Sequence, residues 1–155
     1  MLFLMGILIY GRDYGKETEI GPLGGSIKQN SEHDYWYHKK TCRTFHRLDL
    51  ISLGVCTFSD PPEHLLCLGY IRLFKVNLVN LEKEFVQSYG DKQLRKHMKD
   101  VPEIRYDYDF RVYLERDMSL TPLWVKHERN ALLKAAISWC QDNEILYTIE
   151  AGQNT

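Results

Sequence analysis

Four residues in the second half of the chain have the chemistry for metal-dependent hydrolysis of a phosphodiester bond: Glu82, Glu84, Asp109 and Lys126. Acidic side chains hold a divalent cation near the scissile phosphate, and the cation lowers the pKa of its bound water and neutralises charge in the transition state. A lysine beside the metal orients the water or stabilises the developing oxyanion. We therefore expect Mg²⁺ or Mn²⁺ on Asp109 with Glu82 or Glu84, and Lys126 in a catalytic role.

These residues must be positioned by a helix and a hairpin. Apolar residues at spacings of three and four predict a helix over 79–89, with Asn80 as its N-cap. Tyr106, Tyr108, Phe110, Val112 and Leu114 alternate with polar residues and predict a strand. The other expected elements are a short basic helical turn (91–99, ended by Pro102), a second hairpin strand (120–126), a helix (128–142) and a closing strand (145–149). The order over 79–149 is helix, strand, strand, helix, strand, so Asp109 and Lys126 would face one cleft.

This segment, Glu82–Ile149, resembles the PD-(D/E)XK nuclease superfamily and, within it, the TnsA-like transposon endonucleases. The likeness rests on the glutamates of the first helix, Asp109-Phe110, Lys126 and the run Trp139-Cys140 through Tyr147-Thr148-Ile149. It implies a restriction-endonuclease-like core and a metal-dependent DNA endonuclease of a phage or mobile element. Trp124 stands two residues before Lys126, where the family has Glu or Gln. Either the acid has moved, with Glu128 as a candidate, or the alignment shifts, or the fold lacks the activity.

Each of these residues also has an ordinary structural explanation. Acids near a helix start are favoured by the helix dipole alone, by roughly 0.3–1 kcal/mol. Asp109 between two aromatic residues is typical of the wet face of an amphipathic strand. Lys126 is equally consistent with an exposed lysine at a strand end. The aromatic residues of the hairpin are more often cross-strand packing than a surface on which bases stack.

The first half of the chain has a basic and aromatic stretch, residues 35–47, with four candidate phosphate contacts: Lys39, Lys40, Arg43 and Arg47. Its alternation of rings and charges predicts a strand with one wet face. The same stretch supports a rival hypothesis, in which the protein is a non-catalytic accessory factor that grips nucleic acid or a protein partner. A partner that delivers DNA is compatible with both hypotheses.

The remainder of the first half predicts strands and loops. The apolar run 1–10 is too short to span a membrane and has no signal-peptide pattern, so it predicts a buried strand. Gly, Ser and Asn predict loop or hairpin over 11–34. Apolar residues predict strands over 50–58 and 65–76. Gly24-Gly25-Ser26 followed by Glu32 and Asp34 is a weak nucleotidyltransferase-like pattern, and a turn explains it equally well.

The cysteines lack the close pairing of a metal knuckle. Five possible zinc ligands gather in the first half: Cys42, His46, Cys56, His64 and Cys67. No C-x-x-C pair occurs among them, and reduced cysteines among apolar residues behave as small hydrophobic side chains. The sequence leaves both readings open.

Composition sets the broad class. The chain has 155 residues, 44% hydrophobic, with 20 Lys and Arg against 21 Asp and Glu, which excludes a disordered chain and a bulk polycation. We expect a single α+β domain over 1–155, with a strand-rich part at 1–77 and the nuclease-like core at 78–150. No apolar run reaches membrane-spanning length, so we expect a cytoplasmic protein without a membrane partner.

Overall fold

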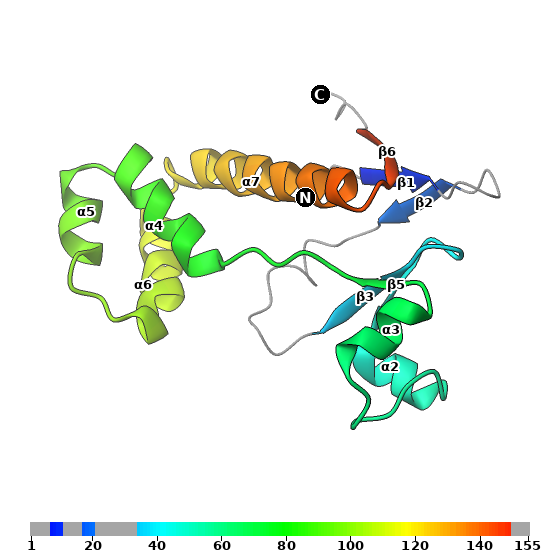
Figure 1. The fold of residues 1–155 in the computed structure, drawn as a ribbon. Helices are drawn as coiled ribbons and strands as arrows, with labels where there is room; N and C mark the ends of the chain where they lie inside the picture. Colours follow the sequence, from blue (N-terminus) through cyan, green and yellow to red (C-terminus); the bar gives the residue numbers. More distant parts are fainter. Residues whose placement is uncertain (1–6, 11–16, 21–33, 150–155) are drawn as a thin grey trace. The chain divides into compact units, whose positions relative to one another are not determined.

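The computed structural model describes residues 7–10, 17–20 and 34–149, which form a mixed structure of helices and short antiparallel strands (Figure 1). The predicted α+β class is confirmed. The elements in chain order are β1 (Ile7–Tyr10), β2 (Glu17–Ile20), β3 (Tyr35–His38), β4 (Arg43–His46), α2 (Arg47–Ser52), α3 (Pro62–Cys67), β5 (Tyr70–Arg72), α4 (Leu78–Tyr89), α5 (Lys92–Met98), α6 (Glu103–Arg116), α7 (Thr121–Asp142) and β6 (Leu146–Ile149).

The chain divides into two compact units. One unit combines Met1–Lys75 with Ala135–Thr155, and the other is Val76–Lys134. The second boundary falls inside α7, so this helix supplies residues to both units.

The first unit contains two antiparallel sheets of three strands, in the orders β2-β1-β6 and β4-β3-β5. In the second sheet, Trp36 of β3 faces Phe45 of β4 on one side and Arg72 of β5 on the other. Trp36 and Tyr37 point to opposite faces of β3, and both are buried because each face is covered. Leu50 of α2 and Leu65 of α3 cluster with Trp36, and the Trp139 ring packs edge-on against Tyr37 with 5.5 Å between the ring centroids.

The second unit is helical. The N-cap residues of α4 and α5 are Asn77 and Asp91. Their side chains accept hydrogen bonds from the backbone N–H groups of Asn80 (3.0 Å) and Leu94 (2.7 Å), respectively. One residue, Gly90, separates α4 from this second cap. The buried core joins α4, α5, α6 and the first part of α7 through Leu81, Phe85, Val86, Leu94, Met98, Tyr106, Phe110, Leu114, Leu120 and Trp124.

Both strands of the predicted hairpin are helices, so that prediction is wrong. Residues 104–114 lie in α6 and 120–126 lie at the end of a turn and in α7. Of the five alternating apolar residues, only Tyr106, Phe110 and Leu114 are buried, and they lie four residues apart. Tyr108 between them is 68% exposed. Apolar residues at every second position therefore include residues at every fourth position, and burial in a helix follows the spacing of four.

The remaining element predictions had mixed outcomes. The helices over 79–89 and 91–99 and the strand at 145–149 are confirmed as α4, α5 and β6, and 128–142 is helical within α7. The N-cap of α4 is Asn77 and not Asn80. The strand predicted over 50–58 is wrong, because this segment is the end of α2 and a loop. Within 65–76 only β5 is a strand. The first apolar run does contain β1, whereas Gly24-Gly25-Ser26 and Glu32 lie outside the described residues.

Candidate functional site

The two predicted glutamates lie on opposite sides of α4. Glu82 is completely buried, whereas Glu84 is exposed to solvent. Residues two positions apart on a helix point about 200° away from each other. The structure therefore does not direct these two carboxylates toward one metal ion.

Asp109 and Lys126 lie on helices, so the alternation that would have placed them over one cleft is absent. Asp109 on α6 forms an ion pair with Arg105 one turn earlier, with 3.2 Å between Oδ1 and Nη2. Lys126 on α7 is exposed. Trp124 belongs to the core, where its ring packs edge-on against Phe110 and Phe85. Among the described residues, no group of three or more His, Cys, Asp or Glu side chains has the arrangement of a metal site. The possible zinc ligands named above are among the residues to which this applies.

A buried acid network in the second unit escaped the sequence analysis. It consists of Glu82 on α4, Asp107 and Arg111 on α6, and Glu128 on α7. Arg111 Nε donates a hydrogen bond to Asp107 Oδ1 at 3.0 Å, and Glu128 is 8% exposed. Asp107 and Arg111 are themselves half exposed, so this network extends from the core to the surface. The spacing of Asp107 and Arg111, one helical turn, is the sequence signal that could have indicated it.

Burial decides the charge of this network. Desolvation raises the pKa of Glu82 to about 9, and the neighbouring carboxylates of Asp107 and Glu128 add to the shift. A protonated Glu82 can donate a hydrogen to Asp107. Both oxygens of Glu82 are buried and accept no hydrogen bond from the described residues, which costs a neutral acid less than it costs a carboxylate. Burial alone would raise the pKa of Asp107, but the hydrogen bonds from Glu82 and Arg111 lower it. Glu82 is therefore the neutral acid of the network, and its partner Asp107 is ionised.

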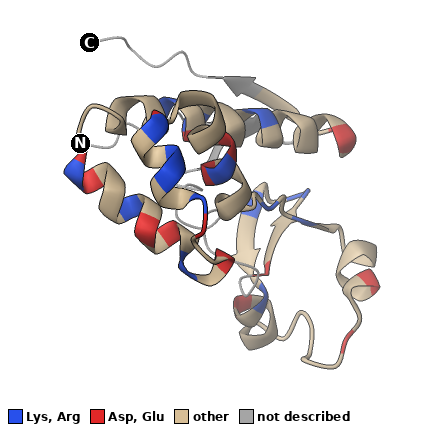
Figure 2. Ribbon diagram, turned by 90° about the vertical axis from the view of Figure 1, so that its left-hand side faces the viewer, with Lys and Arg blue, Asp and Glu red and all other residues tan. Residues whose placement is uncertain are grey.

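The predicted phosphate contacts fall into two places. Lys39, Lys40 and Arg43 lie at the tip of the β3–β4 hairpin, where all three are exposed (blue in Figure 2). None of the three forms an ion pair with another residue that the structure describes. We call these three residues the basic tip. Three unpaired cations on one turn are suited to contact a polyanion.

The turn that carries the basic tip is held by several hydrogen bonds. Cys42 has a left-handed backbone (φ 54°), and its N–H donates to the carbonyl of His38 at 2.9 Å. The His38 ring bonds to the Thr41 hydroxyl at 2.9 Å and packs against Tyr70. The N–H of Lys39 donates to Gly69 O at 3.1 Å, which ties the tip to the start of β5. These bonds fix the backbone on which the cations stand.

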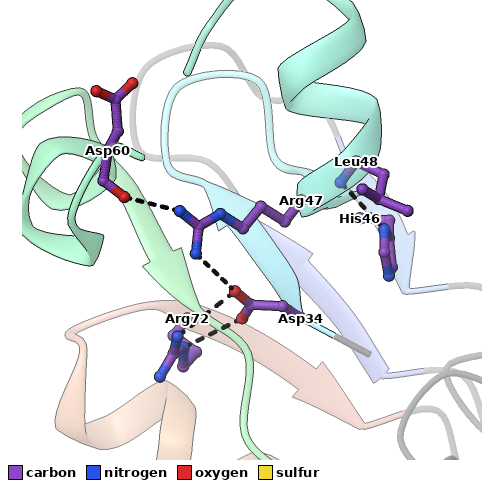
Figure 3. Close-up of polar contacts among 6 residues, drawn as sticks. All are labelled: Asp34, His46, Arg47, Leu48, Asp60 and Arg72. Carbon is purple, nitrogen blue, oxygen red and sulfur yellow. Dashed lines mark hydrogen bonds and ion pairs between the residues drawn. The ribbon is translucent and has the colours of Figure 1, made fainter. Parts of the chain in front are cut away.

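Arg47, the fourth predicted contact, serves inside the protein instead. Its guanidinium donates to the carbonyl of Asp60 at 2.7 Å and pairs with the carboxylate of Asp34 at 3.8 Å (Figure 3). Arg72 pairs with the same carboxylate at 3.2 Å and lies over the Trp36 ring. Arg47 therefore joins α2 to the loop that precedes α3.

Comparison of the chain with models of protein families, with curated proteins and with solved structures gave no match. In the part of the chain that the structure describes, no helix combines the length and the apolar character needed to cross a membrane.

Proposed function

We propose that the protein binds nucleic acid through the basic tip and acts as a non-catalytic accessory factor. The observation that carries this proposal is the set of three exposed cations, Lys39, Lys40 and Arg43, on a turn held by hydrogen bonds. A fixed turn loses little conformational freedom on binding, so more of the attraction to phosphates appears as affinity.

The contacts available at the basic tip favour the phosphate backbone over the bases. Trp36, Tyr37 and Tyr70, which lie on the central strand that leads to the turn and on its neighbour β5, are buried in the sheet and are not open to a base. Phosphate contacts position a protein on nucleic acid but carry no sequence information directly. We therefore expect weak binding with little sequence preference, in keeping with a factor that acts beside a partner.

The test compares two triple variants of equal charge. In a fluorescence anisotropy titration of short labelled duplex DNA, K39A/K40A/R43A removes the basic tip. K92A/K96A/K99A removes three exposed lysines from the second unit, and each variant changes the net charge from −1 to −4 (−1 − 3 = −4). We expect the first variant to lose most of the binding and the second to keep it. An equal loss in both would mean that overall charge, and not the basic tip, produces the binding.

The endonuclease activity that the resemblance implies stays a prediction. The placement of Glu82, Glu84 and Asp109 gives no converging set of oxygen ligands, so we derive no reaction step through a metal. Supercoiled DNA incubated with Mg²⁺ or Mn²⁺ and either the wild type or Asp109→Ala tests the activity and its assignment together. Cleavage that depends on Asp109 would replace the accessory factor with an endonuclease.

A further inference from the structure

The two short helices of the first unit carry large apolar side chains on their outer side. Five of them are between 45% and 77% exposed: Leu48, Leu53, Phe58, Leu66 and Leu68. Leu48 lies on α2 and Leu66 on α3, Leu53 and Phe58 lie between the two helices, and Leu68 directly follows α3. Both helices contribute a buried leucine to one core cluster (Figure 1). We call this set the α2–α3 apolar surface. Single exposed apolar residues are ordinary, but five within 21 residues mark an interaction site.

The loop that carries Phe58, the most exposed of the five, is held in place. The N–H of Thr57 donates to the Asp60 carboxylate at 2.7 Å, and the hydroxyl groups of Thr57 and Ser59 lie 3.2 Å apart. Arg47 holds the carbonyl of Asp60 from α2 (Figure 3). Phe58 therefore lies on a turn whose backbone is held by hydrogen bonds. A large side chain on a fixed backbone is typical of residues that dominate binding energy.

All the charges of this region have one sign. Between Arg47 and Arg72 the chain contains Asp49, Asp60 and Glu63 and no lysine or arginine. Asp49 and Glu63 are exposed, and neither pairs with a cation among the described residues. The α2–α3 apolar surface is thus accompanied by unneutralised carboxylates, which attract positive charge.

We propose that this surface docks an amphipathic helix of a partner protein that carries lysine or arginine beside its apolar face. Burial of the five apolar side chains supplies the attraction, and the exposed carboxylates of Asp49 and Glu63 select the sign of the partner's charge. A second copy of the chain would bring like charges together across a symmetric contact. Anionic membranes would be repelled for the same reason. The proposal is independent of nucleic-acid binding by the basic tip.

The probes are two synthetic amphipathic peptides with the same leucine face. One has lysine at every polar position and the other has glutamate. Their binding to the full chain is followed by fluorescence anisotropy, with far-ultraviolet circular dichroism to verify that each variant is folded. We expect the lysine peptide to bind at least about tenfold more tightly than the glutamate peptide.

Matched variants localise the binding. L53S/F58S removes two side chains of the surface, and I104S/M118S removes two exposed apolar side chains from the second unit. D49N/E63Q removes two carboxylates of the surface, and D100N/E115Q removes two exposed ones elsewhere. We expect L53S/F58S to weaken the lysine peptide about tenfold or more, D49N/E63Q to weaken it less and in a salt-dependent way, and the two controls to leave it unchanged.

Three results would overturn the proposal. The first is an equal loss in the control variants, or no binding of the lysine peptide to the wild type. The second is self-association of the wild type that L53S/F58S abolishes in sedimentation, which would make a second copy the occupant. The third is binding to vesicles of phosphatidylserine and phosphatidylcholine that depends on Phe58, which would make it a membrane surface.

Discussion

Glu82 is a buried acid whose pKa rises on folding. Its carboxyl lies completely inside the second unit, next to Asp107 and Glu128, and Arg111 is the cation that acts on it. A buried acid that shares its surroundings with other acids stays protonated at neutral pH. Glu82 was predicted to bind a metal, but its burial makes it an internal hydrogen-bond donor that affects stability through pH.

The first prediction concerns Glu82→Gln. The pKa of Glu82 rises from 4.5 to about 9 on folding, so the folded state binds more protons and the wild type loses stability as pH rises from about 4.5 to about 9. Glutamine keeps a neutral donor toward Asp107 and removes this loss. We expect the variant to be more stable by roughly 1–3 kcal/mol at pH 8 and unchanged near pH 4.5. Urea unfolding across this pH range measures it. The exposed Glu84→Gln is the control, and a pH dependence unaltered by Glu82→Gln would contradict the assignment.

The second prediction concerns the thiols. Cys67 is exposed, whereas Cys42, Cys56 and Cys140 are buried, and burial raises the pKa of Cys140 to about 11. Because a reagent must reach the sulfur, Cys67 is the thiol that is open to reaction. We expect one thiol to react quickly with a disulfide reagent at pH 8 and three to react only on unfolding. Cys67→Ser should remove the fast phase, and a fast phase that survives this change would place another thiol at the surface.

At the scale of elements, α6 decides between two interpretations of the same residues. If residues 104–114 formed the predicted strand, Tyr108 and Phe110 would share one face. On the helix they separate, with Phe110 fully buried against Phe85 and Trp124 and Tyr108 exposed. The ion pairs Arg105–Asp109 and Asp107–Arg111 span one turn each, which also requires a helix.

The third prediction follows from this difference. Phe110→Ala should lower the free energy of unfolding by about 3–5 kcal/mol, because it leaves a cavity in the core. Tyr108→Ala should change it by no more than about 0.5 kcal/mol. Chemical denaturation followed by tryptophan fluorescence gives both values. Similar losses in the two variants would favour the strand.

The sequence predicted the elements whose signals were local and unambiguous. For α4, apolar residues at spacings of three and four indicated a helix, and for α5 the segment 91–99 before Pro102 was predicted as a short helical turn. For α6 the aromatic residues satisfied periods of two and four at once, and only packing against Phe85 and Trp124 chose between them. Three of the four predicted phosphate contacts form the basic tip. The fourth, Arg47, instead contacts Asp34 and Asp60, which lie 13 positions away on each side. Such long-range pairing has no local signature.

At the scale of the whole molecule, the near-zero net charge hides local excesses of one sign. The segment 36–48 holds four Lys and Arg and no acid, and the segment 48–71 holds three acids and no Lys or Arg. In the second unit α6 pairs Arg105 with Asp109 and Arg111 with Asp107, whereas the segment 91–99 holds four Lys and Arg against one acid. In the first unit the basic tip and the two acids Asp49 and Glu63 are exposed and form no ion pair with another described residue, so both are available to partners of opposite sign.

The fourth prediction concerns salt. A net charge of −1 gives no long-range attraction to nucleic acid, so binding depends on the few contacts of the basic tip. Each phosphate neutralised contributes about 0.9 to the slope of log K against log salt, so three cations give a slope of about −2.7 on duplex DNA and about −2.1 on a single strand. Anisotropy titrations between about 50 and about 200 mM salt measure this slope. We expect Lys39→Ala alone to reduce it by about one phosphate contact. A steeper slope in the wild type, or one that Lys39→Ala does not alter, would mean that cations outside the basic tip carry the contact.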